Sequence, residues 1–262
     1  MALESFQVGE GTQATVLLHG FLGTGRNLRS LASAWSALEP QRRFLLPDLT
    51  GHGSSPPLPE GATLETLASD VVTSAREAGL QGPLHLVGHS LGGRVSLVAS
   101  VRFPADVAQV DLLDISAGPI PVTTSDTASV LERLLEAPAR ATDRRAMRAE
   151  LMARGLSGPL SDWLVMNLQP APEGGVVWRF DREALARLHA RMNAQDLWHA
   201  VERPSPPRPP MRCVRGARSS YVLEEDRRRL EAAGVPVATL PGAGHFVHVD
   251  APDALLAWLR QG

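Results

Sequence analysis

The chain reads Gly88-His89-Ser90-Leu91-Gly92 at the point that decides its fold. An apolar run at residues 84–87 precedes this stretch, and a helix-like segment at residues 94–102 follows it. A serine between glycines at a strand-to-helix junction predicts a sharp, strained turn, because a Cβ at either glycine would collide with the neighbouring strand or helix. The serine hydroxyl is then exposed above the sheet at a helix N-terminus, where free N–H groups favour developing negative charge. Ser90 is therefore the candidate nucleophile.

Three other loops follow strand-like runs in the same way. His19-Gly20-Phe21-Leu22-Gly23 follows residues 14–18, the loop 48–54 follows residues 44–46, and the loop 242–246 follows residues 235–240. The last of these loops carries His245. Their order along the chain is the order in which one known fold places an oxyanion loop, a nucleophile and a base.

The pattern of apolar runs predicts an α/β fold with a mostly parallel, doubly wound sheet. Strand-like runs alternate with helix-like segments that would cover both faces of this sheet. The strand-like runs are residues 14–18, 43–47, 84–88, 110–115, 211–215 and 235–240, and the helix-like segments are 27–38, 63–80, 91–102, 222–233 and 252–260. Residues 3–8 add a short antiparallel strand at the sheet edge.

The alternation stops between about residues 120 and 204. Helical stretches at 126–137, 142–154, 159–168 and 181–200 take its place. We therefore expect a helical cap, residues 120–204, inserted into an α/β core made of residues 1–119 and 205–262. The proline-rich run 204–210 is stiff and extended, and it would return the chain to the core.

Composition excludes several classes of function. The chain has 262 residues and a net charge of −2, so no overall field points to nucleic acid or to an anionic membrane. It contains no lysine, which excludes a lysine Schiff base and a P-loop lysine. Cys213 is the single cysteine, so no intramolecular disulfide can form, and we expect it to be a buried core residue. With no leader-like or membrane-spanning segment in the sequence, we expect a soluble, cytoplasmic protein that acts on a small molecule.

The four loops together resemble those of the α/β-hydrolase family over nearly the whole chain. The chain is most similar to small bacterial and mitochondrial serine esterases, which share three further stretches. Here these read Asp114-Ile115-Ser116, Trp178-Arg179-Phe180 and, over residues 215–222, Arg-Gly-Ala-Arg-Ser-Ser-Tyr-Val.

A serine nucleophile needs a base within hydrogen-bond reach, and His245 is the best candidate. The histidines at 19, 52 and 89 lie inside turn motifs and are expected to organise loops, while those at 85, 189 and 199 fall on a predicted strand or on helices. His248 lies three residues after His245, outside the turn, and with His89 is a candidate for lining the pocket.

The acid departs from the usual pattern of the family. Most relatives carry it after Gly-x-x on the turn that follows the strand leaving the cap, but here that position is Ser219. A serine cannot hold the base's tautomer or balance its charge. The resembling esterases instead imply Asp114, at the end of the neighbouring strand. The alternatives are Asp111, nearer the closed end of the sheet, and Glu225 and Asp226, in a charge-rich helix.

The oxyanion hole needs two backbone N–H groups, which the resemblance assigns to Phe21 and Leu91. The side chains of Phe21 and Leu22 are candidates for an apolar acyl pocket. These parts suffice for acyl transfer without a metal or organic cofactor, and the scattered histidines lack the spacing of a zinc protease.

The expected function is therefore hydrolysis of a carboxylic ester or thioester on a Ser-His-Asp triad. One alternative is a cofactor-free lyase or carbon–carbon hydrolase on the same triad, since residues 19–23 and 90–94 look like those of the menaquinone-pathway lyase. Another is a catalytically silent binding protein. Arginines of the cap form either a solvated face or a site for an anionic substrate: Arg133, Arg140, Arg144, Arg145, Arg148 and Arg154.

Overall fold

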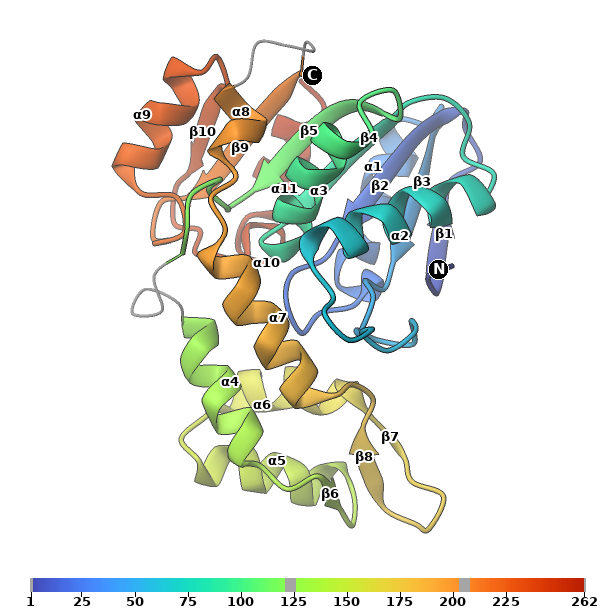
Figure 1. Cartoon of the computed structure of the whole chain (residues 1–262), viewed down its shortest axis with the longest axis vertical. Coiled ribbons are helices and arrows are strands. Elements are labelled where there is room, and N and C mark those ends of the chain that lie inside the picture. The colour runs from blue at the N-terminus through green and yellow to red at the C-terminus, as the bar shows by residue number, and fades with distance from the viewer. Residues whose placement is uncertain (1, 121–125, 203–207, 262) are drawn as a thin grey trace.

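A seven-stranded sheet carries the molecule, with every strand parallel except the first (Figure 1). The computed structural model describes residues 2–120, 126–202 and 208–261. The strands lie in the order β1-β3-β2-β4-β5-β9-β10, and β1 pairs antiparallel with β3 at the edge, as the sequence predicts. Their bounds are β1 Ser5–Val8, β2 Gln13–Leu18, β3 Arg42–Pro47, β4 Leu84–His89, β5 Val107–Leu113, β9 Met211–Gly216 and β10 Val237–Leu240.

Helices cover both faces of the sheet because each central strand is apolar on both sides. In β2, Val16 and Leu18 pack into one cluster while Leu17 packs into the other, as the two-residue period of a strand requires. The first cluster includes residues of α2 Leu64–Glu77, α3 Leu91–Arg102 and α9 Glu224–Ala232. The second includes residues of η1 Gly25–Leu28, α1 Arg29–Leu38 and α11 Pro252–Leu259. The predicted doubly wound fold is confirmed.

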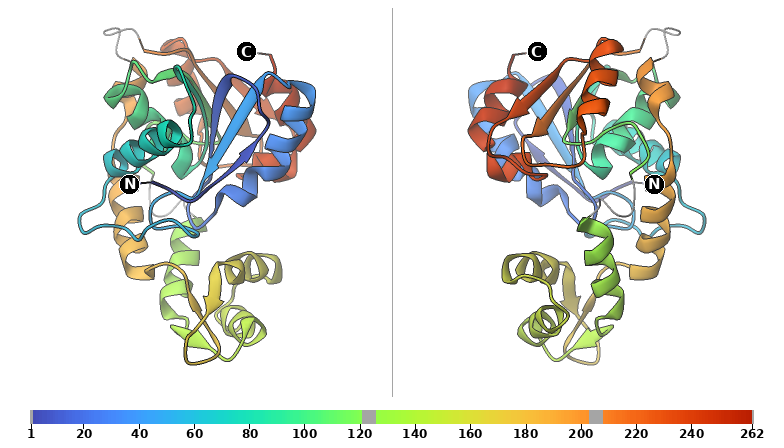
Figure 2. Two further views of the ribbon diagram at one scale, coloured as in Figure 1. Left: turned by 90° about the vertical axis from the view of Figure 1, so that its right-hand side faces the viewer. Right: turned by 90° about the vertical axis from the view of Figure 1, so that its left-hand side faces the viewer.

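Most of the segment between β5 and β9 gathers at one end of the molecule, beyond the sheet, while its last helix lies beside α3 (Figures 1 and 2). The segment contains α4 Asp126–Glu136, α5 Arg144–Ala153, α6 Gly158–Leu164, η3 Val165–Asn167, α7 Arg182–Ala194 and α8 Trp198–Glu202. Helix α7 runs from this end back toward the sheet. The predicted return segment 204–210 lies largely outside the described residues.

Two details of this segment differ from the prediction. It is not wholly helical, because β6 Arg140–Ala141, β8 Val176–Trp178 and β7 Leu168–Pro170 form a small antiparallel sheet. The predicted helix 181–200 is interrupted after Ala194, where the carboxylate of Asp196 accepts a hydrogen bond from the backbone N–H of Trp198 (2.8 Å) and starts a new helix. Strands of two or three residues carry too little two-residue period to be read from sequence.

Arg94 joins the two connections of this segment to the core. Its side chain is fully buried in α3 and donates hydrogen bonds to the backbone carbonyls of Gly118 (2.8 Å) and Gln195 (2.6 Å). Burial lowers the pKa of Arg94 to about 10. Because the guanidinium stays charged at neutral pH, it ties the chain entering the segment to the chain leaving it.

Candidate active site

The turn at Ser90 has the strained geometry that the sequence predicts. Ser90 adopts φ 52° and ψ −114° between β4 and α3, and its backbone N–H bonds to the carbonyl of Leu113 (3.1 Å). A Cβ at Gly88 would lie 2.3 Å from the carbonyl group of Gly92, and one at Gly92 would lie 2.3 Å from the carbonyl oxygen of Leu18. Only glycine fits at either position. Ser90 is 9% exposed, so it lies under neighbouring loops and not on an open surface.

Asp114 and His245 form a direct hydrogen-bonded pair. The Nδ1 of His245 lies 2.7 Å from Oδ2 of Asp114, and since an ionised carboxylate only accepts, Nδ1 carries the proton. Asp114 follows β5 and has φ 53°, while His245 lies on the loop after β10. Two loops at the carboxyl ends of the strands therefore supply the pair. The Nε2 atom of His245 is left to contact a reacting group.

Ser219, which stands where most relatives carry the acid, bonds to the carboxylate of Asp114. Its hydroxyl donates to Oδ2 of Asp114, the same oxygen that accepts from His245, and Oδ1 accepts the backbone N–H of Gly216 (2.8 Å). Asp114 is fully buried, so these three donors replace the water that would otherwise solvate its charge. Ser219 thus supports the carboxylate of Asp114, the candidate acid.

Tyr221 is a site residue that the sequence reasoning missed. Its ring stacks on the imidazole of His245 with 3.7 Å between centroids and 16° between planes. The backbone N–H of Tyr221 donates to Oγ of Ser219 (3.2 Å). The signal was present in the 215–222 motif, which contains Ser219 and Tyr221, but their contacts depend on the turn after β9, which brings Tyr221 onto the ring of His245.

The predicted oxyanion loop, residues 19–23, lies against Ser90. A Cβ on Gly20 would lie 2.7 Å from Nδ1 of His89 and 3.4 Å from Cβ of Ser90, so this loop packs closely on the elbow. The next two residues are Phe21 and Leu22, and Leu22 has a positive φ of 60°. Among the described residues, neither Phe21 nor Leu91 donates its backbone N–H in a turn or loop hydrogen bond, and Leu91 is the first residue of α3, whose N–H has no acceptor within the helix. Two such amides are what an oxyanion hole requires.

His19 holds this loop in place, in agreement with the loop-organising role predicted for it. Its Nδ1–H donates to the carbonyl of Gly20 (2.8 Å), and its Nε2 accepts the N–H of Leu49 (2.9 Å). A second proton on Nε2 would break the bond to Leu49. Burial lowers the pKa of His19 to about 4, which is consistent with a neutral ring.

Two other histidines near Ser90 are buried or partly buried, His89 and His248. His89 donates from Nε2 to the backbone carbonyl of His245 (2.9 Å), and burial together with the neighbouring His245 puts the pKa of His89 well below its usual range. The ring of His248, on α10 Val247–Asp250, lies 4.7 Å from that of His89. Burial, reinforced by His245, lowers the pKa of His248 to about 4. His89 therefore supports the backbone of the candidate base.

The segment between β5 and β9 contacts the loops of the site from several elements. Nδ2 of Asn167 donates to the carbonyl of Leu22 (3.2 Å). The ring of His189, on α7, lies 4.7 Å from that of Phe21, and Trp163, on α6, lies edge-on to Phe246. His189 was predicted to be a packing or solvated residue of this segment, and the structure buries it against the oxyanion loop.

The rival acids lie elsewhere. Asp111 is fully buried in β5 between His85 (2.9 Å) and a two-point contact with Arg212 (2.5 and 2.9 Å). Asp226 caps α9 through the N–H of Leu223 (3.0 Å), and Glu225 is exposed on the same helix. None of these three carboxylates is a recorded partner of His245 in the described chain.

Most of the predicted arginine face is engaged within its own segment. Five of the six arginines bond to neighbouring carboxylates or carbonyls there: Arg133 to Glu136, Arg140 to Glu173, Arg144 to Val165 and Leu168, Arg148 to Asp162, and Arg154 to Glu150. These contacts favour the structural explanation of this face over an anion site.

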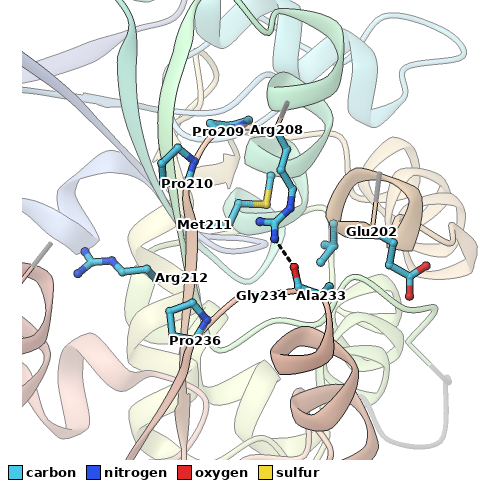
Figure 3. A pocket seen from close by; sticks show the side chains of 10 residues that line it. Glu202, Arg208, Pro209, Pro210, Met211, Arg212, Ala233, Gly234 and Pro236 are labelled. Atoms are coloured by element: carbon cyan, nitrogen blue, oxygen red, sulfur yellow. Dashed lines mark hydrogen bonds between the residues drawn. The ribbon is translucent and has the colours of Figure 1, made fainter. Parts of the chain in front are cut away.

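A separate cleft of about 670 Å³ opens at the other end of β9 and β10 (Figure 3). It is lined by Arg208, Met211 and Pro236 among others, and Arg208 donates to the carbonyl of Ala233. These residues lie where both strands begin, whereas Ser219 and His245 follow the ends of the same strands. The cleft is therefore not part of the Ser90 site.

Among the described residues, no helix is long and apolar enough to span a membrane.

Comparison with known proteins places the chain in a family. Residues 15–258 match the model of the alpha/beta hydrolase family. The chain is 29% identical to the sn-1-specific diacylglycerol lipase ABHD11 of Mus musculus over 258 residues, covering 94% of this chain and 80% of that protein. It is 26% identical to esterase YbfF of Escherichia coli (strain K12) over 252 residues, covering 94% and 91% of the two chains. A solved marine microorganism esterase superposes with a TM-score of 0.87 at 21% identity, over 99% of this chain and 98% of the other. This chain belongs to the alpha/beta hydrolase family.

Proposed function

We propose that this protein is a serine hydrolase that cleaves carboxylic esters or thioesters, with Ser90 as nucleophile, His245 as base and Asp114 as acid. The observation that carries the proposal is the 2.7 Å bond between His245 and the fully buried Asp114, on loops beside a strained Ser90. The family, and the names of an esterase and a lipase among its relatives, support ester hydrolysis as the reaction.

In the proposed acylation, Nε2 of His245 removes the proton of Ser90 as its Oγ attacks the substrate carbonyl carbon. The N–H groups of Phe21 and Leu91 donate to the resulting oxyanion, and losing one such donor typically raises the barrier by about 3 kcal/mol. The imidazolium then protonates the leaving alcohol or thiol. An acyl ester of Ser90 remains.

Deacylation repeats these steps with water as the nucleophile. His245 takes a proton from the water, the carboxylic acid leaves, and Ser90 recovers its proton. Asp114 accepts from Nδ1–H throughout, which fixes the neutral tautomer and stabilises the imidazolium. Every role is filled by a residue of this chain.

The segment 120–204 is proposed to act as a cap over this site, with residues 1–119 and 205–262 as the core. Contacts of Asn167, His189 and Trp163 with the loops of the site support this assignment. The apolar, buried side chains of Phe21 and Leu22 suit the acyl part of a substrate. The name of the mouse relative adds glycerolipid esters to the substrates worth testing. A cytoplasmic location remains part of the proposal, and cell fractionation would test it.

A fluorophosphonate probe tests the proposal directly, because it reacts with a serine only when a base activates it. We expect stoichiometric labelling, with the adduct mapped to Ser90 by mass spectrometry. A parallel panel of p-nitrophenyl esters of increasing chain length and of acyl-CoA thioesters would define the leaving group and the acyl length. No labelling and no turnover of any member would contradict a hydrolase function.

A further inference from the structure

We propose that Tyr221 is a positioning residue that couples helix α4 to the imidazole of His245. The inference rests on the proposed function, in which His245 is the base. It adds a link between the inserted segment and the chemistry of the site.

The stack fixes one face of the imidazole. The rings of Tyr221 and His245 lie 3.7 Å apart between centroids and are nearly parallel, at 16°. The bond from Nδ1 to Asp114 leaves the imidazole free to tilt about the Nδ1···Oδ2 axis, and a ring packed against its face opposes that tilt. Nε2 is thereby aimed in one direction.

The turn that holds the acid also holds the tyrosine. Oγ of Ser219 donates to Asp114 and accepts the N–H of Tyr221 (3.2 Å). The position of the Tyr221 ring is therefore set relative to the acid–base pair by a local hydrogen bond within three residues of chain.

The phenol reaches out of the core to the inserted segment. Its hydroxyl lies 3.0 Å from Oγ1 of Thr127, in the first turn of α4. Tyr221 is thus connected to Thr127 at one end and stacked on His245 along its ring. A displacement of α4 would move the phenol and with it the face on which the base rests.

The stack also suits the charge that forms during the reaction. When His245 takes the proton of Ser90, a cation appears against the face of an aromatic ring, and the ring quadrupole attracts it. The contact is stronger after proton transfer than before, so it lowers the barrier more than it strengthens substrate binding. Its loss is expected to appear in kcat more than in KM.

Two substitutions separate the stack from the link. Tyr221→Leu removes both, and we expect kcat to fall by about two- to thirtyfold, with the acid limb of the kcat/KM profile moving to lower pH by about half a unit or more. Tyr221→Phe keeps the stack and removes the hydroxyl, so kcat should fall by about two- to tenfold with the pH profile unchanged. Thr127→Val should match Tyr221→Phe, and the double variant should be no worse than either one alone. Ser129→Ala, an exposed change on the same helix, is the control and should leave all of these values unchanged.

The single tyrosine of the chain gives a readout that does not depend on activity. With ring-labelled tyrosine, NMR shows one residue, whose Cζ signal reports the hydroxyl and whose ring protons report the stack. We expect Thr127→Val to move the Cζ signal, and His245→Ala to move the ring protons.

These measurements separate the two proposals. If the NMR shifts appear but the wild type neither hydrolyses esters nor takes the fluorophosphonate label, the function is wrong and the coupling stands. If the wild type is an esterase and folded Tyr221→Leu keeps its kcat and pH profile, the positioning role is wrong. Unchanged NMR signals in both Thr127→Val and His245→Ala would likewise overturn the coupling.

Discussion

The carboxylate of Asp114 and the imidazole of His245 are 131 residues apart in the chain and 2.7 Å apart in the structure. Asp114 follows β5 and His245 follows β10, with β9 between these strands in the sheet. The turn after β9 carries Ser219, whose hydroxyl bonds to Asp114. The candidate acid, its hydrogen-bond partner Ser219 and the candidate base therefore follow three adjacent strands of the sheet.

Ser90→Ala should abolish ester turnover and fluorophosphonate labelling while leaving the free energy of unfolding nearly unchanged. Alanine tolerates the positive φ no worse than serine, and only one oxygen is lost. Ser100→Ala, a buried position on the same helix outside the elbow, is the control and should keep full activity. Most of the activity surviving in Ser90→Ala would remove the serine mechanism.

His245→Ala should reduce kcat by several orders of magnitude, whereas His248→Ala should be mild. His245 is the histidine that contacts Asp114, while His248 packs against His89. Steady-state kinetics of the two purified variants provide the measurement. A larger loss of kcat in His248→Ala than in His245→Ala would show that the base has been assigned to the wrong histidine.

Asp114→Asn should lower kcat by about 10⁴-fold with little change in KM, because an amide cannot both fix the tautomer and balance the imidazolium. Glu225→Gln, an exposed change on α9, should have almost no effect. Kinetics of both variants with one ester would test the assignment. Near-wild-type turnover in Asp114→Asn would show that Asp114 is not the acid of the triad.

Restoring a carboxylate at the common position should recover part of that loss. Because Ser219 already reaches Oδ2 of Asp114, the double variant Asp114→Asn, Ser219→Asp places a carboxylate next to His245 from the turn after β9. We expect its kcat to exceed that of Asp114→Asn alone by at least about tenfold. A double variant that is folded but no faster would show that a carboxylate on the turn after β9 does not reach the imidazole.

Stability should fall as the pH drops from about 6.5 toward 4. Burial lowers the pKa of His19 and His248 to about 4 and, assisted by the neighbouring His19, that of His52 to about 3. These rings have a pKa of about 6.5 in the unfolded chain, so the unfolded chain binds more protons than the folded one between about pH 6.5 and 4. The free energy of unfolding therefore reaches its full value only above about pH 6.5. Each ring contributes up to about 1.4 kcal/mol per pH unit to the slope.

Urea unfolding at pH 7, 6 and 5 measures this slope before most carboxylates titrate. In the variant His19→Asn, the slope of the free energy of unfolding against pH should be smaller by about the contribution of one proton. A free energy of unfolding that is constant between pH 7 and 5 would contradict the neutral, buried state of these histidines.

Much of this protein follows from local sequence. The glycines around Ser90 are required because a Cβ there would overlap backbone atoms, and a long apolar run between turn residues specifies a buried strand whatever lies beside it. These features are local, so residues 84–92 indicate the elbow, the three other loops strengthen that prediction, and the alternation of runs predicts the sheet. The resemblance to esterases supplied Asp114, which strand periodicity alone left beside Asp111.

What the sequence could not determine is which side chains meet across strands. The sequence shows that Ser219 stands where most relatives carry an acid. Its hydrogen bond to Asp114, however, exists only because β5 and β9 pair in parallel with their ends aligned. Likewise, Tyr221 and Thr127 are 94 residues apart, and no periodicity connects them. Local backbone preferences and burial decided the strands, the elbow and the candidate nucleophile, whereas the support of the base depends on distances between loops, which strand order and register set.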